Sequence, residues 1–317
     1  MVSLVLISCK IEKQKRAVAS PWDAMKSIEK LVRVPVFKDK TYSVVDFGAV
    51  PGGVFDCTLA INLAIRTCSN EGGGKVLIPS GKYLAGPINL ENNVNLHLEE
   101  GTEILFSTNP LDYPIVHTSY EGTELMNYSP LIYAYKKSNI AVTGKGVLNG
   151  QASNENWWWW SGSETYGWSK GMPNQKDPLN LFRLMDMAEE GVSVSERVFG
   201  EGHYLRPTFV DFFECTNVLL KDIKIINAPF WVIHPMKSSN VTIDGVTVQS
   251  HGPNNDGCDP EYSKNVIIKN CTFNTGDDCI AIKSGRNADG RRVAIPSENI
   301  VVKNCKMIDG HGGVVIG

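Results

Sequence analysis

Short runs of alternating apolar and polar residues, rich in valine and isoleucine, recur along most of the chain. Six of these runs open with an asparagine followed by a β-branched residue, at Asn93, Asn139, Asn217, Asn240, Asn265 and Asn299. Their starts are separated by 46, 78, 23, 25 and 34 residues. The spacing predicts stacked units, with two copies of a 23-residue unit in the first gap and a coil or more plus inserted loops in the wider gaps.

A repeat of short strands is typical of a solenoid, in which each coil buries its inward side chains on the coils above and below it. The strands are bounded by Gly, Asn and Asp, and no helical pattern lies between them, which argues against βαβ units. We therefore predict an all-β fold, a right-handed parallel β-helix over residues 41–317. We expect further C-terminal coils that this sequence does not contain, because it stops in mid-strand at Gly317.

Two stretches near the N-terminus have a helical pattern, at residues 22–32 and 58–68. The first belongs to a predicted tether over residues 10–40. The second is expected to cap the open end of the β-helix through Leu59, Leu63 and Ile65, because stacked architectures need capping units.

Glycine-bearing turns carry the candidate chemistry: Asn-Asn-Asp-Gly at 254–257, Gly-Asp-Asp-Cys at 276–279 and Gly-His-Gly at 310–312. Aligning Asn265 with Asn299 matches Asp277 with His311, on adjacent coils whose strands lie about 4.8 Å apart. Asp256 precedes Asp277 by 21 residues, close to one coil, on a longer turn. Such turns are often only structural. Adjacent acids facing a third acid and a histidine favour acid/base cleavage of a glycosidic bond instead.

These turns resemble the signature of the pectin-degrading polygalacturonases, glycoside hydrolase family 28. That signature is an Asn-Thr-Asp turn, a Gly-Asp-Asp turn, a Gly-His-Gly turn and a later Arg-Ile-Lys. Here Asn255 stands where threonine is usual, and the fourth element lies beyond the sequence. The resemblance runs from about Tyr42 to the end and includes Val-Asp-Phe-Gly-Ala at 45–49.

The resemblance implies hydrolysis of α-1,4-linked galacturonate with inversion. Asp277 would be the general acid, Asp256 and Asp278 would activate water, and His311 would support the acid or contact the substrate. An inverting mechanism needs room for the water, so acid and base are expected roughly 6.5–9.5 Å apart. No cofactor or metal is implied.

An anionic substrate calls for cations in the groove. Lys283 and His251 are the candidates for binding it, with Arg291 and Arg292 as weaker ones. The run Trp157–Trp160 lies in a long insertion between Gly150 and about Arg206. It either lines distal sugar subsites or plugs the loop onto the coil stack. The enlarged loop favours attack at chain ends.

Residues 1–9 end in Leu-Ile-Ser-Cys and resemble a bacterial lipoprotein signal, shorter than usual, with Cys9 as the lipidated residue. The expected location is secreted or periplasmic, as an outer-membrane lipoprotein if Cys9 is lipidated. Beyond Cys9 there are seven cysteines, an odd number that forces no disulfide framework. Cys57 with Cys68, or Cys258 with Cys279, are candidate pairs, whereas Cys271 and Cys305 occupy equivalent strand positions.

The formal net charge of −3 does not oppose an acidic substrate, because the local charge of the groove matters more. We expect a monomer that acts on pectic polysaccharide or oligogalacturonide, not nucleic acid. Three alternatives stay open: a lyase using calcium held by Asp256, Asp277 and Asp278, a rhamnogalacturonan hydrolase on the same fold, and a non-catalytic glycan-binding β-helix.

Overall fold

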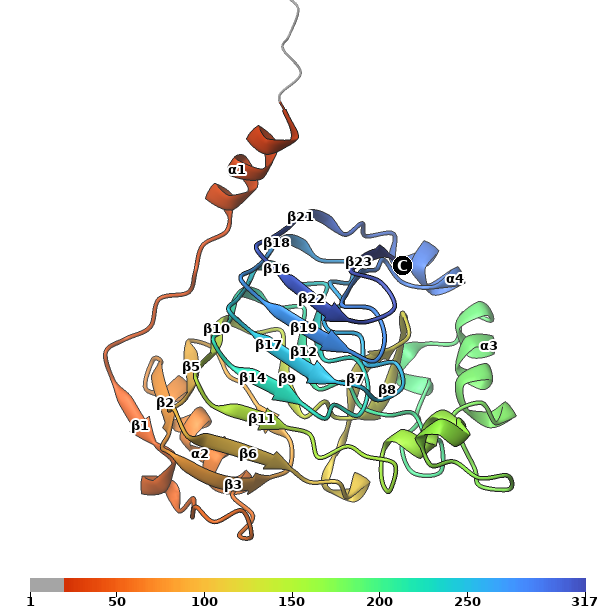
Figure 1. Cartoon of the computed structure of the whole chain (residues 1–317), viewed down its shortest axis with the longest axis horizontal. Helices are drawn as coiled ribbons and strands as arrows, with labels where there is room; N and C mark the ends of the chain where they lie inside the picture. Colours follow the sequence, from red (N-terminus) through yellow and green to blue (C-terminus); the bar gives the residue numbers. More distant parts are fainter. Residues whose placement is uncertain (1–19) are drawn as a thin grey trace, which may run out of the picture.

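The computed structural model describes residues 20–317 and forms a right-handed parallel β-helix, as predicted (Figure 1). Most coils contribute one strand to each of three parallel sheets, called A, B and C. Sheet A is the longest, with β1 (Thr41–Ser43), β2 (Gly74–Ile78), β5 (Val94–Leu98), β10 (Ser138–Gly144), β13 (Thr216–Lys221), β16 (Ser239–Asp244), β18 (Lys264–Lys269) and β21 (Glu298–Lys303).

Sheets B and C complete each coil. Sheet B holds β3 (Gly81–Ala85), β6 (Thr102–Phe106), β11 (Val147–Asn149), β14 (Lys224–Ile226), β17 (Thr247–Ser250), β19 (Thr272–Thr275) and β22 (Lys306–Asp309). Sheet C holds β4 (Ile88–Asn89), β9 (Ile132–Tyr135), β12 (Val210–Phe213) and β15 (Ile233–Met236), and single bridges through Cys258 connect these to β20 (Ile280–Ile282) and β23 (Val314–Ile316).

The six asparagines that open the sequence repeats stack in one ladder. Each side-chain amide donates to the amide oxygen of the preceding asparagine, at 3.0–3.2 Å, from Asn139 to Asn93 through to Asn299 to Asn265. All six have φ between 52° and 62°, a left-handed conformation that asparagine tolerates better than most residues. The ladder explains why an asparagine begins each coil.

The ladder also corrects one expectation from the sequence. Asn139 lies directly on Asn93, and β10 pairs with β5, so the first gap of 46 residues is one coil and not two. The additional length is an antiparallel hairpin of β7 (Ile115–Tyr120) and β8 (Thr123–Tyr128), inserted between sheets B and C.

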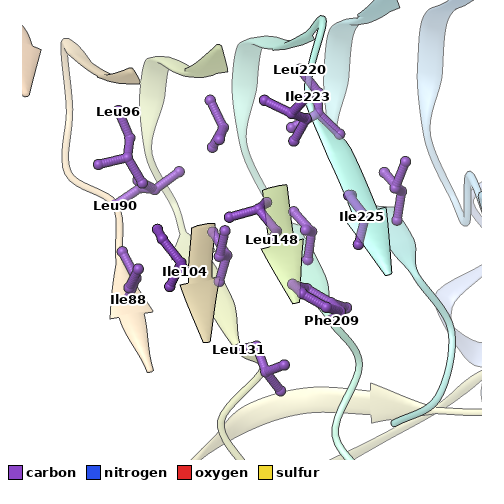
Figure 2. Close-up of a cluster of buried hydrophobic side chains, with 14 of the residues drawn as sticks. Ile88, Leu90, Leu96, Ile104, Leu131, Leu148, Phe209, Leu220, Ile223 and Ile225 are labelled. Carbon is purple, nitrogen blue, oxygen red and sulfur yellow. The ribbon is translucent and has the colours of Figure 1, made fainter. Parts of the chain in front are cut away.

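The core is a column of aliphatic side chains that point inward from all three sheets. Figure 2 shows part of this column, where Leu96 and Leu220 of sheet A face Ile104, Leu148 and Ile225 of sheet B. These side chains are fully buried. Burial of apolar surface, at about 25 cal/mol per Å², therefore acts between successive coils and fixes their register.

A helix caps the N-terminal end of the column, as predicted, and of the three expected capping residues only Ile65 is buried there. This helix, α2 (Thr58–Asn70), buries Ile61 and Ile65 together with Ala64 and Cys68. Leu59 and Leu63 are 81% and 46% exposed and take no part in the cap. The earlier helix α1 (Pro21–Leu31) packs against β18 and β21, where Glu29 pairs with Lys303.

Two further helices lie on insertions, α3 (Arg183–Glu189) and α4 (Asn287–Val293). The predicted lipoprotein signal at residues 1–9, with Cys9, lies outside the described residues, as does the start of the tether. No helix within residues 20–317 is long and apolar enough to cross a membrane. Within the same range, all seven cysteines are free, so neither candidate disulfide is formed.

Candidate active site

The two aspartate turns and the histidine turn stack at the junction of sheets B and C. Asp256 follows β17, Asp277 and Asp278 connect β19 to β20, and His311 lies between β22 and β23. The backbone N–H of Gly257 donates to the carbonyl of Asp278 at 2.8 Å, and that of His311 donates to the carbonyl of Asp277 at 3.1 Å. The register of Asp277 with His311 is therefore the one that the sequence predicts.

Two features hold these turns at close range. Gly276 leaves no room for a side chain, because a Cβ there would lie 2.6 Å from the carbonyl oxygen of Gly252. Asn255 is buried and its side-chain oxygen accepts from Ser250 Oγ at 2.5 Å and from the N–H of Gly252 at 2.9 Å. The asparagine in place of the usual threonine thus fixes the long turn that carries Asp256.

The Asp277 carboxyl is oriented through one of its oxygens. Its Oδ1 accepts the N–H of Asp278 at 2.9 Å and lies 3.1 Å from Nδ1 of His311. Within residues 20–317, Oδ2 of Asp277 forms no hydrogen bond. This second oxygen is therefore free to present a proton to a bound ligand.

Asp256 belongs to a buried cluster of alternating charge. The ammonium of Lys283 donates to Asp256 Oδ2 at 2.9 Å, lies 3.0 Å from Asp259 Oδ1 and stands 3.8 Å above the ring centre of Trp231. The Asp259 side chain is fully buried, and its oxygens have no hydrogen bond to any described residue. Lys283 therefore carries the only opposite charge that the described part of the chain places beside Asp259.

Burial dominates the proton affinities of these carboxyls. It raises the pKa of Asp256, against the effect of Lys283, and raises the pKa of Asp259 well above its usual range. Burial, and then the charge of Asp277, raise the pKa of Asp278. Ionised bases in this cluster thus depend on the lysine.

At their nearest oxygens, the proposed acid and bases lie closer than the roughly 6.5–9.5 Å expected between whole carboxyl groups. Asp256, Asp277 and Asp278 each offer an oxygen, and these oxygens lie within 4.8 Å of one another. The reason is the spacing of about 4.8 Å between strands of adjacent coils, which sets the distance between stacked turns.

Three carboxylates at this range could also hold a cation such as calcium. One oxygen of Asp256 already accepts from Lys283, so a divalent ion would have to displace a positive charge. The donor set therefore fits a calcium ion poorly.

Two adjoining cavities flank Asp277. The first, of about 400 Å³, is lined by Asp256, Asp278, Lys283 and Trp231, and the second, of about 530 Å³, by His311 and the insertion at residues 161–185. Four residues line both cavities: Glu121, Asn254, Asp277 and Arg286.

The tip of the β7–β8 hairpin closes one side of both cavities. Arg286 donates from Nη1 to Glu121 Oε2 at 2.7 Å and from its backbone N–H to the carbonyl of Gly122 at 3.1 Å. Gly122 has φ of 82°, and a Cβ there would lie 3.1 Å from Arg286 Cβ, so a glycine allows this close approach.

Arg206 connects the insertion to the turn that carries Asp256. Its buried guanidinium donates to Gln175 Oε1 at 2.9 Å, to Asn254 Oδ1 at 2.7 Å and to the carbonyl of Pro253 at 2.6 Å. Tyr120 of the hairpin donates to the same Gln175 oxygen at 2.7 Å.

Several sequence candidates lie elsewhere. His251 does not line either cavity, and its Nε2 faces Asp309 at 3.6 Å. Arg292 donates to the carbonyl of Ala188 at 2.7 Å and secures α3, and Arg291 is exposed beside Glu189. Of the tryptophan run, Trp157 and Trp160 are buried in the main core cluster, with Trp158 and Trp159 packed against it, which is the plug and not a sugar platform.

Sequence reasoning missed Asp259, Glu121 and Arg286. Asp259 follows Asp256 by three residues and Arg286 follows Lys283 by three, and none of the four lies in a strand, so strand alternation gave no signal that they would share one site. Glu121 carried no sequence signal, because its hairpin is an insertion.

Comparisons with known proteins identify the family of the chain. The model of glycosyl hydrolases family 28 matches residues 198–317, and that of rhamnogalacturonase A/epimerase, pectate lyase-like, matches residues 41–100. The chain is 48% identical to a hyperthermoactive exopolygalacturonase from Thermotoga maritima, covering 93% of this chain and 66% of that one, with a TM-score of 0.91.

More distant relatives are also similar to this chain. The family 28 exopolygalacturonase of Yersinia enterocolitica has a TM-score of 0.68 at 26% identity, covering 88% of this chain and 51% of that one. The exo-poly-alpha-D-galacturonosidase of Dickeya chrysanthemi is 27% identical, covering 88% of this chain and 47% of the relative, so the chain spans about half the length of both. With the stacked aspartate and histidine turns, these matches show that the chain belongs to glycosyl hydrolase family 28.

Proposed function

We propose that the protein hydrolyses α-1,4-galacturonosidic bonds of pectic polysaccharide or oligogalacturonide, with inversion, from chain ends. The observation that carries this proposal is the position of Asp277 between two cavities, with Asp256 and Asp278 on one side only. The names of the relatives, exopolygalacturonase and exo-poly-alpha-D-galacturonosidase, support the same substrate class.

In this proposal the glycosidic oxygen lies at Oδ2 of Asp277. The carboxyl gives its proton to that oxygen as the bond from the anomeric carbon to it breaks. A water attacks the anomeric carbon from the opposite face and gives a proton to Asp256 or Asp278. His311 contacts the other oxygen of Asp277 at 3.1 Å and is proposed to hold the acid in this orientation.

Attack at chain ends follows from the closed side of the cleft. A polymer that runs through the first cavity would have to pass the hairpin tip, where Glu121 and Arg286 are paired. A terminal sugar avoids this obstacle. Lys283 is proposed to keep Asp256 ionised as a base, while its remaining surface contacts the sugar.

The test measures new reducing ends on polygalacturonate with the protein produced at its natural length. We expect Asp277→Asn to lower kcat by roughly 100-fold or more, whereas Asp309→Asn, on an exposed carboxyl outside both cavities, keeps it. Equal rates for Asp277→Asn and the parent would remove Asp277 as the acid. Loss of activity in a chelator, together with unsaturated products that absorb in the ultraviolet, would show that the reaction is that of a lyase and not hydrolysis.

Lipid anchoring at Cys9 and a secreted or periplasmic location remain proposals from the sequence Leu-Ile-Ser-Cys at 6–9. Incorporation of labelled palmitate in a bacterial host, absent in Cys9→Ser, tests the anchor. A labelled Cys9→Ser protein would exclude it.

A further inference from the structure

The two cavities beside Asp277 differ in which catalytic groups they contain. Asp256 and Asp278 line the first cavity and not the second, whereas His311 lines the second and not the first. The bases must act on the sugar whose anomeric carbon is attacked, and the acid on the oxygen that leaves with the other sugar. On the proposed function, the first cavity therefore takes the terminal sugar and the second takes the leaving part of the substrate.

The cations of the two cavities are not equally available. In the first, Lys283 is engaged by Asp256 and Asp259. Arg286, which lines both cavities, is paired with Glu121 at 2.7 Å. Lys176 also lines the second cavity, is exposed, and has no carboxylate within ion-pair distance among residues 20–317.

Apolar side chains adjoin this lysine. Tyr166, Phe182 and Met185 line the same cavity, and Phe182 is 52% exposed. An exposed aromatic ring offers contact area for the apolar face of a sugar at a low cost in rotamer entropy. The insertion at residues 161–185 that supplies this surface is held on the catalytic turns by Arg206 and Gln175.

We propose that the second cavity is a subsite for the leaving unit that selects a free uronate carboxylate over its methyl ester, with Lys176 as the specificity-determining cation and Phe182 beneath the sugar. This inference rests on the proposed function and adds the esterification state of the substrate. An ammonium attracts a carboxylate by a charge-assisted hydrogen bond, which a neutral ester cannot reproduce.

The test compares two digalacturonates, with a free carboxylate or a methyl ester on the reducing-end unit. We expect Lys176→Met to lower kcat/KM for the free acid by about tenfold or more and to leave the ester nearly unchanged, so that discrimination collapses. Added salt should weaken the wild type on the free acid and the variant much less. The control Lys170→Met, an exposed lysine of the same insertion outside both cavities, should behave as wild type.

The variant Phe182→Ala should weaken both substrates alike, because stacking does not depend on the ester. If Lys176→Met still prefers the free acid over the methyl ester as strongly as the wild type does, the inference is wrong. Hydrolysis by the wild type would in that case still support the proposed function. If the wild type cleaves neither polygalacturonate nor either digalacturonate, the proposed function fails. Calorimetric binding of the free acid to Asp277→Asn, with and without Lys176→Met, then decides the subsite, and equal affinities would refute it.

Discussion

Replacing Lys283 by methionine tests the charge cluster beneath the cleft. Methionine keeps most of the side-chain volume and its contact with Trp231, and removes the ammonium that lies 2.9 Å from Asp256 and 3.0 Å from Asp259. The side chains of Lys283, Asp256 and Asp259 are 18%, 5% and 0% exposed, so water replaces little of the lost charge.

Removing one partner of a buried ion pair costs about 3–5 kcal/mol, because the remaining charge is uncompensated. We expect Lys283→Met to lower the free energy of unfolding by about this amount near neutral pH. The loss should shrink in acid. Without the lysine, the pKa values of Asp256 and Asp259 rise further in the folded state, which then binds more protons than the unfolded state, so stability falls as pH rises.

Urea unfolding at several pH values measures this effect, with Lys264→Met on an exposed lysine as the control. The double variant Lys283→Met with Asp259→Asn should recover much of the stability, because it removes the stranded charge. In the activity profile, the acid limb should move to higher pH, because the base Asp256 ionises later. A loss below about 1 kcal/mol that does not change with pH, within the range of ordinary surface substitutions, would refute the reasoning.

Three further outcomes are expected. In the asparagine ladder, Asn240→Gly should lower the free energy of unfolding by roughly 1–3 kcal/mol, because two side-chain hydrogen bonds are lost. Asn240→Ala should lower it by about 1 kcal/mol more, because alanine is strained at this positive φ. Urea unfolding measures both, and equal losses would exclude the backbone strain. Burial raises the pKa of Asp211 to about 6, so the folded state keeps a proton that the unfolded state releases. Stability, measured as the melting temperature, should therefore fall as the pH rises from about 4 to 6. Asp211→Asn should flatten this pH dependence, and an unchanged dependence would contradict the shift. Glu121→Lys should repel Arg286 and lower the monosaccharide share of the products by chromatography, with partial recovery when Arg286→Glu is added; an unchanged product pattern would exclude the hairpin as the closing wall.

The β-helix was predictable because its coils repeat both a packing pattern and a backbone conformation. The asparagine at each coil start combines a tolerated left-handed φ with an amide that bonds the next coil, so the residue marks the register directly. The coil count failed at the first gap, because the β7–β8 hairpin adds a length that equals one more coil. The cap failed in detail, because α2 has two apolar stripes and sequence alone does not say which one faces the column.

The stacking of the aspartate and histidine turns was predictable for the same reason as the coils. Residues at equal positions in successive coils become neighbours, as Asp277 and His311 do. The distance between the acids was not predicted correctly. An expectation taken from reaction stereochemistry ignores the strand spacing, which determines how far apart stacked turns can lie.

The groups that were missed share a physical cause. Asp259 acts through burial and through one contact with Lys283, and burial depends on what covers sheet C. That cover is the β7–β8 hairpin, whose Thr118 and Ser119 reach Asp211 and Glu261. The repeat therefore determines where the acids lie. The insertions determine how far water is excluded from the site, which lysine has no carboxylate partner, and where a bound polymer is obstructed. Members of this architecture that share every catalytic turn can differ in product and substrate wherever their insertions differ.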